Sequence, residues 1–143
     1  MKAFVYTILL ALFVFSCNST KTVTENSAPK TISEEDTVRI TNDELEYEII
    51  IIEPGFNTWL QSVARPEGYY SQDFLENRNL QYVIAWNQRV MQPQQFNPDL
   101  YAMQIDYQNG IDYGYEVNYK LYNYFIYFQL TYKQKLAGFI PRI

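Results

Sequence analysis

The sequence predicts one small α+β domain, with elements in the order strand, helix, helix, strand, helix and a core rich in tyrosine. Three observations support this prediction: a run of β-branched residues, two stretches with apolar residues at helical spacing, and 14 tyrosines, of which all but Tyr6 follow residue 44. The roughly 100 residues after that position suffice for one modest hydrophobic core.

The first strand is predicted at residues 47–53, where four isoleucines follow one another. β-Branched side chains favour extended backbone, and an uninterrupted apolar run is typical of a strand that is covered on both faces. Pro54 and Gly55 then stop the strand.

The next two elements are predicted to be helices. Asn57 is a candidate N-cap for the first, which ends before Pro66, and Ser71 is a candidate N-cap for the second, which ends before Pro93. The apolar stripe of the first helix consists of Phe56, Trp59, Leu60 and Val63. The corresponding stripe of the second consists of Leu75, Tyr82, Val83, Trp86 and Val90, with Asn79 in line.

The last third contains a second predicted strand at residues 101–107 and then a turn at Asn109-Gly110. Two structures remain open for residues 117–136. As a strand they show apolar residues at alternate positions. As a helix they carry apolar residues at helical spacing, with Lys133 and Lys135 in the last turn and Gly138 just past it. Because a strand of that length is unusual, we predict the helix.

The N-terminal residues have the pattern of a lipoprotein signal. One basic residue, Lys2, precedes the uncharged stretch 3–15, which is too short to span a membrane comfortably. Val14-Phe15-Ser16-Cys17 then resembles the bacterial lipobox, in which the cysteine receives a diacylglycerol and the peptide is cleaved before it. We therefore expect residues 1–16 to be a signal peptide and Cys17 to be lipidated. The alternative is an ordinary cleaved signal with an incidental cysteine nearby.

Residues 17–43 are predicted to be a flexible tether between this lipid and a globular domain at 44–143. The segment has no aromatic residue and is rich in Ser, Thr, Asn and Glu, so it can bury little apolar surface. Within it, Asp36-Thr37-Val38 resembles the short signal for O-glycosylation of exported Bacteroidota proteins, which makes Thr37 a candidate modification site. No acidic cluster of the kind linked to surface export follows Cys17, which favours a periplasm-facing position on the outer membrane.

The folded part also resembles a known family. The segments "YEIIIIEPGFNTWL", "YYSQDFLENRNLQYVIAWNQRV" and "IDYGYEVNYKLYNYF" are similar in order to a family of small Bacteroidota lipoproteins that is classed as a domain of unknown function. The similarity covers residues 44–138. It implies a location in the cell envelope and a single compact domain, and it supplies no catalytic residues.

The composition excludes most catalytic chemistry. The chain has no histidine, and its single cysteine is the one expected to carry lipid, so histidine-based triads, thiolate catalysis and the usual transition-metal ligands are missing. Five glycines, scattered singly, form no phosphate-binding loop. We therefore expect no metal and no cofactor. Residues 54–143 carry equal numbers of acidic and basic residues, which gives no basic footprint for nucleic acid.

The last predicted helix offers a candidate partner surface. On a helix, a second apolar stripe that includes several tyrosines lies opposite the first, and lysines accompany it. A helix apolar on two sides is either buried in the core or pressed against a partner, and both alternatives remain open. Aromatic residues with nearby cations suit a protein or glycan partner or an anionic lipid headgroup. The candidate surface consists of Tyr115, Tyr119, Tyr122, Lys120 and Lys133.

Carboxylates give two weaker hints. Glu67 and Glu76 are the best available acid and base for a hydrolase of envelope glycans, but Glu76, like Asp73, fits the acidic first turns of a helix equally well. The oxygen-rich stretch from Asp106 to Asp112 resembles a calcium loop, yet its glycine is one place early, so Gly110 is expected to serve a turn. The sequence thus predicts a lipid-anchored, non-enzymatic binding or scaffolding protein. A carboxylate-dependent hydrolase of envelope glycans is the first alternative. A periplasmic small-molecule carrier, which would need a sizeable enclosed apolar pocket, is the second.

Overall fold

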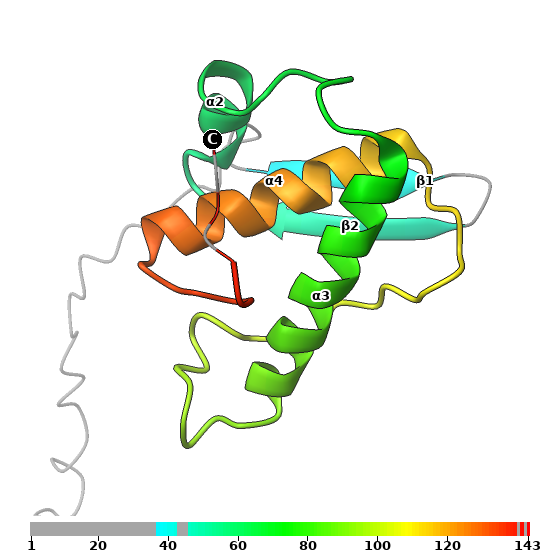
Figure 1. The fold of residues 1–143 in the computed structure, drawn as a ribbon. Coiled ribbons are helices and arrows are strands. Elements are labelled where there is room, and N and C mark those ends of the chain that lie inside the picture. Colours follow the sequence, from blue (N-terminus) through cyan, green and yellow to red (C-terminus); the bar gives the residue numbers. More distant parts are fainter. Residues whose placement is uncertain (1–36, 43–45, 140, 142) are drawn as a thin grey trace, which may run out of the picture. The chain divides into compact units, whose positions relative to one another are not determined.

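The computed structural model of the chain describes residues 37–42, 46–139, 141 and 143. The predicted signal peptide, Cys17 and the first part of the predicted tether lie outside these residues. Figure 1 shows the described elements, which are β1 (Thr37–Asn42), β2 (Tyr47–Ile52), α2 (Phe56–Ser62), α3 (Gln72–Val90) and α4 (Tyr115–Thr131). The α+β class, the single small domain, the aromatic-rich core and the order of the strand at 47–53 and the three helices are confirmed.

α4 is the central element of the fold. It contacts α3, β1 and α2, and Figure 1 shows it (orange) running beside the strands and crossed by α3 (green). Most of its side chains are buried, including Leu121 and Phe125 on one side and Tyr119 and Tyr122 on the other. The helical alternative for residues 117–136 is therefore the right one, with the helix apolar all round because it lies inside the core.

The predicted end of this helix is wrong. α4 ends at Thr131, and Lys133 has a left-handed backbone with φ 54°. The side-chain oxygen of Gln129 then accepts a hydrogen bond from the backbone N–H of Leu136 at 2.9 Å. This contact turns the chain back along α4 and buries Leu136, so the segment reaches α3 and does not continue as helix.

β1 corrects the predicted boundary of the tether. It pairs antiparallel with β2, with Ile40 opposite Ile49, and the Ile40 side chain is fully buried in the core. The folded domain therefore begins by Thr37, and the end of the predicted tether at residue 43 is wrong. The polar composition was misleading, because a two-stranded sheet can form where it packs against a helix, and β1 contacts α4.

The prediction that both faces of the isoleucine strand are covered is also wrong. Ile49 is half-buried, whereas Ile50 and Ile52 are 47% and 53% exposed. Alternate residues of a strand point to opposite faces, and the core covers only one face of this two-stranded sheet. The run of β-branched residues therefore predicts the strand correctly, but it does not predict that one face of the strand is exposed.

Residues 101–107 form no strand. The segment follows α3 as an irregular chain whose backbone binds side chains of that helix. The indole N–H of Trp86 donates to the Met103 carbonyl at 3.0 Å, and the Asn87 amide binds both the N–H and the carbonyl of Ile105 at 2.9 Å. Because these side chains satisfy the backbone, no neighbouring strand is needed.

The helix caps follow the prediction in one case of two. Ser71 caps α3, its hydroxyl accepting from the Phe74 N–H at 3.3 Å. α2 begins after Gly55 instead of Asn57, with φ 83° at the glycine. No helix among the described residues combines the length and the apolar character that crossing a bilayer requires.

Candidate functional site

The predicted partner surface on α4 is not formed. Tyr119 and Tyr122 are each only 5% exposed, and the Tyr119 hydroxyl donates to the Arg65 carbonyl at 2.7 Å. Lys120 pairs with Glu116 one helical turn away, and Lys133 lies beyond the end of the helix. The other alternative, a helix buried in a tyrosine-rich core, is the one observed.

Tyrosine hydroxyls of α4 donate hydrogen bonds to the chain segments before and after α2. Tyr115 donates to the Tyr70 carbonyl at 3.3 Å, and Tyr127 donates to the Pro54 carbonyl at 2.7 Å. Buried phenol groups normally find such acceptors, and here the acceptors are carbonyls of irregular chain that have no helical partner. The role of these hydroxyls is therefore structural.

The two predicted modification sites have different positions. Cys17 lies outside the described residues, so its lipidation stays a prediction. Thr37 is the first residue of β1, opposite Ile52 in the register. The glycosylation prediction assumed a flexible tether at this position, and the structure places a strand there.

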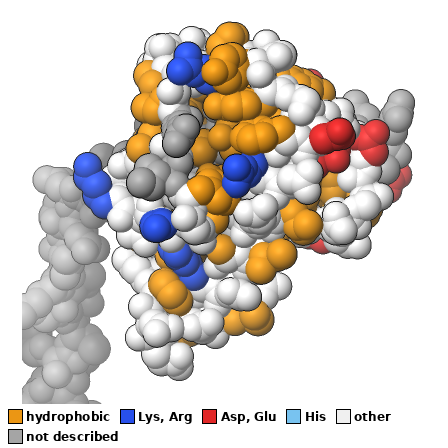
Figure 2. All heavy atoms as spheres, in the orientation of Figure 1, with side chains coloured by type: hydrophobic (Ala, Val, Ile, Leu, Met, Phe, Trp, Pro, Cys, Tyr) orange, Lys and Arg blue, Asp and Glu red, His pale blue; other side chains and the backbone are white. Residues whose placement is uncertain are grey.

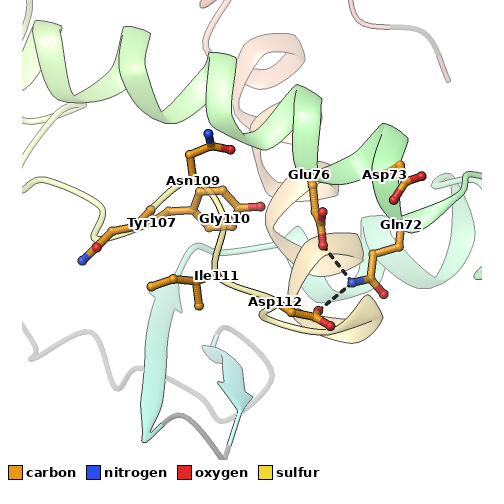
Figure 3. Close-up of a pocket in the computed structure, with 9 residues that line it drawn as sticks. Gln72, Asp73, Glu76, Tyr107, Asn109, Gly110, Ile111 and Asp112 are labelled. Atoms are coloured by element: carbon orange, nitrogen blue, oxygen red, sulfur yellow. Dashed lines mark hydrogen bonds between the residues drawn. The ribbon is translucent and has the colours of Figure 1, made fainter.

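The predicted acid–base pair shares no described cavity. Glu67 is exposed in the loop between α2 and α3, whereas Glu76 lines a polar cavity of about 330 Å³ between the start of α3 and residues 107–112. The structure instead brings Glu76 together with Asp112, as Figure 3 shows. The Gln72 side-chain nitrogen donates to one oxygen of each carboxylate, at 2.7 Å in both cases.

The carboxylates of this polar cavity hold the loop in place. Asp112 also accepts from the Gly114 N–H at 2.9 Å, just before α4 begins. Asp106 accepts from Gln108 and does not line the cavity, and Gly110 has φ 85° as a turn residue, as expected. The described residues contain no group of three acidic, histidine or cysteine side chains suited to a metal ion. We therefore assign the polar cavity a structural role.

A second, larger cavity is lined mainly by aromatic rings and arginines. Its volume is about 880 Å³, within the usual range for a small-molecule site, and it lies between the α2–α3 loop, α3, α4 and the C-terminal residues. We call it the arginine–aromatic cavity. Its principal lining residues are Arg65, Tyr70, Phe74, Arg78, Tyr82 and Tyr122. Among the described residues, no acidic side chain lines it.

Sequence reasoning missed this cavity, although a signal was present. Phe74, Arg78 and Tyr82 recur every fourth residue, so they stand in one row along α3. Of these three residues, only Tyr82 belongs to the predicted apolar stripe of the helix. On the face of the protein seen in Figure 1, Figure 2 shows basic side chains (blue) among hydrophobic ones (orange), and acidic side chains (red) at one side.

Aromatic packing fixes the walls of the arginine–aromatic cavity. The rings of Tyr70 and Phe74 stack at 4.8 Å between centroids with an interplanar angle of 11°, and Tyr122 meets Tyr70 edge-on at 5.3 Å. The Arg78 guanidinium carbon lies 3.9 Å from the ring centroid of Phe139 and 5.2 Å from that of Phe74. Arg78 therefore has two aromatic rings as neighbours.

The buried tyrosine at this cavity has an unusual hydroxyl. Tyr82 is fully buried, and its hydroxyl finds no hydrogen-bond partner among the described residues. The hydrogen bonds of the nearby Gln129 amide run to the Phe125 carbonyl and from the Leu136 N–H. Burial raises the pKa of Tyr82, which the Gln129 amide lowers only in part, so the group remains a neutral O–H donor at physiological pH.

Comparison with known proteins places the chain in a family. Residues 5–141 match the sequence model of a family of unknown function (DUF6146). The chain belongs to DUF6146. Membership in an uncharacterised family is thus as expected from the sequence, and it assigns no activity to DUF6146 proteins. No curated protein and no solved structure shows significant similarity to this chain.

Proposed function

We propose that this DUF6146 member is a lipid-anchored protein of the bacterial cell envelope that binds a ligand and catalyses no reaction. The lipobox-like segment Val14-Phe15-Ser16-Cys17 supports the anchor. Two or three acyl chains at Cys17, each buried methylene contributing about 0.8 kcal/mol, hold a protein firmly on a bilayer. The similarity to small Bacteroidota lipoproteins supports the same location, with the domain facing the periplasm from the outer membrane.

The arginine–aromatic cavity is the observation that carries the binding role. It combines large aromatic walls with Arg78, which makes no ion pair with a described acidic side chain, and aromatic and arginine side chains dominate binding sites. This cavity replaces the α4 surface as the contact site for a small ligand, a glycan or a protein side chain. The mixed charge of residues 54–143 gives no reason to expect nucleic acid.

The hydrolase alternative has less support. A glycosidase needs two carboxylates free to act across one sugar ring, and the pair in the polar cavity is bridged by the Gln72 amide. The chain also has no histidine to act as a general base. We therefore assign catalysis no part in the function.

Cell fractionation and mass spectrometry test the anchor. The wild-type chain is expected in the membrane fraction, with the mature protein starting at an acylated Cys17. Cys17→Ser should move it to the soluble periplasmic fraction, while Ser16→Ala, which keeps a small residue before the cleavage point, should leave it in the membrane. An unmodified thiol at residue 17 in a protein that washes off membranes contradicts the proposal.

Native mass spectrometry tests the binding role. Protein isolated from its own envelope under mild conditions should carry a bound small molecule or glycan, which Arg78→Gln removes and Lys135→Gln retains. The Lys135 side chain is exposed and does not line the cavity, so this variant controls for the loss of one positive charge. Release of a chemically altered ligand during incubation would show turnover and contradict a purely binding role.

A further inference from the structure

The guanidinium of Arg78 donates to no residue that the structure describes. It makes no hydrogen bond and no ion pair with a described residue, although it is half-buried against Phe74 and Phe139. Two aromatic rings lie beside the planar group, whose five N–H donors lie in its plane and point outward from its edge. The rings therefore contact the cation without using its donors, and no described residue accepts a hydrogen bond from them.

A second arginine lies at the same cavity but already has an acceptor. Arg65 lies 5.1 Å from the ring centroid of Tyr69, and one of its nitrogens donates to a main-chain oxygen of Ile143, the last residue of the sequence, at 3.0 Å. No acidic side chain among the described lining residues neutralises Arg78. A cation without an acidic side chain beside it favours an anionic occupant.

The buried Tyr82 hydroxyl is the second, independent sign of a missing partner. It is a fully buried donor without an acceptor among the described residues, and the Phe139 ring covers Tyr82 at 5.2 Å between centroids. An unsatisfied buried donor costs about 1–3 kcal/mol, and such groups are rare without a reason. An acceptor that reached this hydroxyl from the cavity, which Tyr82 lines, would relieve the cost.

From these observations we infer that the arginine–aromatic cavity binds a ligand with a phosphate or carboxylate group on a flat ring, the anion meeting the edge of Arg78 and the ring meeting Tyr70 and Phe74. The inference rests on the proposed binding function and names the chemical class of its ligand. A bidentate contact between guanidinium and anion supplies specificity, and the stacked rings supply apolar area. Both a free aromatic or sugar phosphate and the headgroup of an anionic lipid present a phosphate, so the test separates the two sources.

Isothermal titration calorimetry on the full chain tests the ligand class with three probes. Phenyl phosphate joins the anion to a ring, whereas inorganic phosphate and phenol each supply one part. We expect phenyl phosphate to bind about tenfold more tightly than either fragment, since the cavity offers both kinds of contact. Arg78→Gln should weaken phenyl phosphate binding by about tenfold or more, and Arg78→Lys, which keeps the charge and loses the planar fork, should fall between. Lys135→Gln should change it by less than about twofold.

Vesicles separate the two sources of the phosphate. If phosphatidylglycerol vesicles bind the full chain more tightly than phosphatidylcholine vesicles, and only Arg78→Gln abolishes the difference, the ligand is a lipid headgroup. If the vesicles show no dependence on Arg78 while phenyl phosphate does, the ligand is a free small molecule. Both outcomes support the anion site.

Equal binding of phenol and phenyl phosphate, or equal binding of every probe by wild type and a folded Arg78→Gln variant, overturns the inference. These results leave the membrane anchor untouched, because Cys17 is tested separately. They also remain distinct from failure of the binding role as a whole, which would show as protein isolated from the envelope without any ligand. Circular dichroism of each variant verifies that the fold is intact.

Discussion

The side-chain amide of Asn87 binds Ile105 as a neighbouring strand would, accepting from its N–H and donating to its carbonyl, both at 2.9 Å. One residue of α3 thus supplies two hydrogen bonds to the long connection between α3 and α4. The neighbouring Trp86 indole adds a third hydrogen bond, to Met103. The connection in turn positions Tyr101, which is buried against Trp86 and Phe128.

Replacing Asn87 should therefore loosen this connection. Asn87→Ala removes both hydrogen bonds to Ile105, and we expect it to lower the free energy of unfolding by about 2–3 kcal/mol. Gln88→Ala, at an exposed neighbouring position on the same helix, should change it by less than about 0.5 kcal/mol. Urea titration measures both values, and hydrogen exchange should show faster exchange at the Ile105 amide in the first variant. A cost below about 0.5 kcal/mol for Asn87→Ala would mean that the connection is held by other contacts.

Gly55 should tolerate no side chain. It has φ 83°, and a Cβ atom built there would lie 3.2 Å from the Tyr127 hydroxyl. That hydroxyl is itself held by the Pro54 carbonyl at 2.7 Å, so it cannot retreat without losing its acceptor. Gly55→Ala is expected to cost more than the roughly 1–2 kcal/mol of left-handed backbone alone.

Gly68 is a matched control for this crowding. It has the same φ of 83°, and nothing lies within 4 Å of the added Cβ. Gly68→Ala should therefore show the backbone cost without the crowding. In a double-mutant cycle, Tyr127→Phe should relieve part of the Gly55→Ala penalty and none of the Gly68→Ala penalty. Equal losses for the two glycine variants in thermal unfolding would refute the steric explanation.

Tyr119 should behave as a core residue. Tyr119→Phe removes the hydrogen bond to the Arg65 carbonyl and is expected to lower the free energy of unfolding by about 1 kcal/mol. Phenyl phosphate binding should stay unchanged, because Tyr119 does not line the arginine–aromatic cavity. Calorimetry and urea titration separate these effects. A loss of binding with unchanged stability would restore Tyr119 to a contact surface.

Stability should fall steeply in alkali. Burial raises the pKa values of Tyr82, Tyr107 and Tyr122, and the hydrogen bond to Glu53, followed by burial, raises the pKa of Tyr132 to about 12. In the unfolded chain tyrosine titrates near pH 10, so above that pH the folded state binds more protons than the unfolded state. The stabilisation is complete below pH 10 and is lost as the pH rises toward 12. Each buried tyrosine contributes a slope of about 1.4 kcal/mol per pH unit.

Urea titrations at a series of pH values measure this dependence. Between about pH 6 and 9 stability should be nearly constant, because the chain has no histidine to titrate there. Tyr132→Phe removes one titrating group and should make the alkaline decline shallower. A free energy of unfolding that stays constant up to pH 11.5 would contradict the burial of these hydroxyls.

Local patterns in the sequence predicted the helices well. The apolar spacing of Phe56 and Trp59, the cap at Ser71 and the row from Leu75 to Trp86 report contacts within one or two turns, and all lie where expected. The isoleucine run correctly predicted β2. The wrong predictions concern segments whose structure depends on contacts outside the segment. Residues 101–107 bind side chains of α3, and the chain after α4 binds the side chain of Gln129 through Leu136.

The candidate site could likewise be predicted from the sequence only in part. Tyrosines and lysines on α4 predicted a surface, but an apolar pattern on every side of a helix cannot tell a partner from the protein's own core. Tyr119 and Tyr122 are covered by the α2–α3 loop and α3, which a local pattern does not encode. The spacing of Phe74, Arg78 and Tyr82 can be recognised in the sequence. That these residues line a cavity depends on Phe139, which lies far along the chain.

A crystal structure of the protein extracted from its native envelope tests the central claim most directly. We predict density for a bound molecule in the arginine–aromatic cavity, with an anionic oxygen within hydrogen-bond distance of the Arg78 guanidinium and a lipid thioether at Cys17. A carboxylate of the protein's own chain paired with Arg78, in a cavity that holds only water, would contradict it.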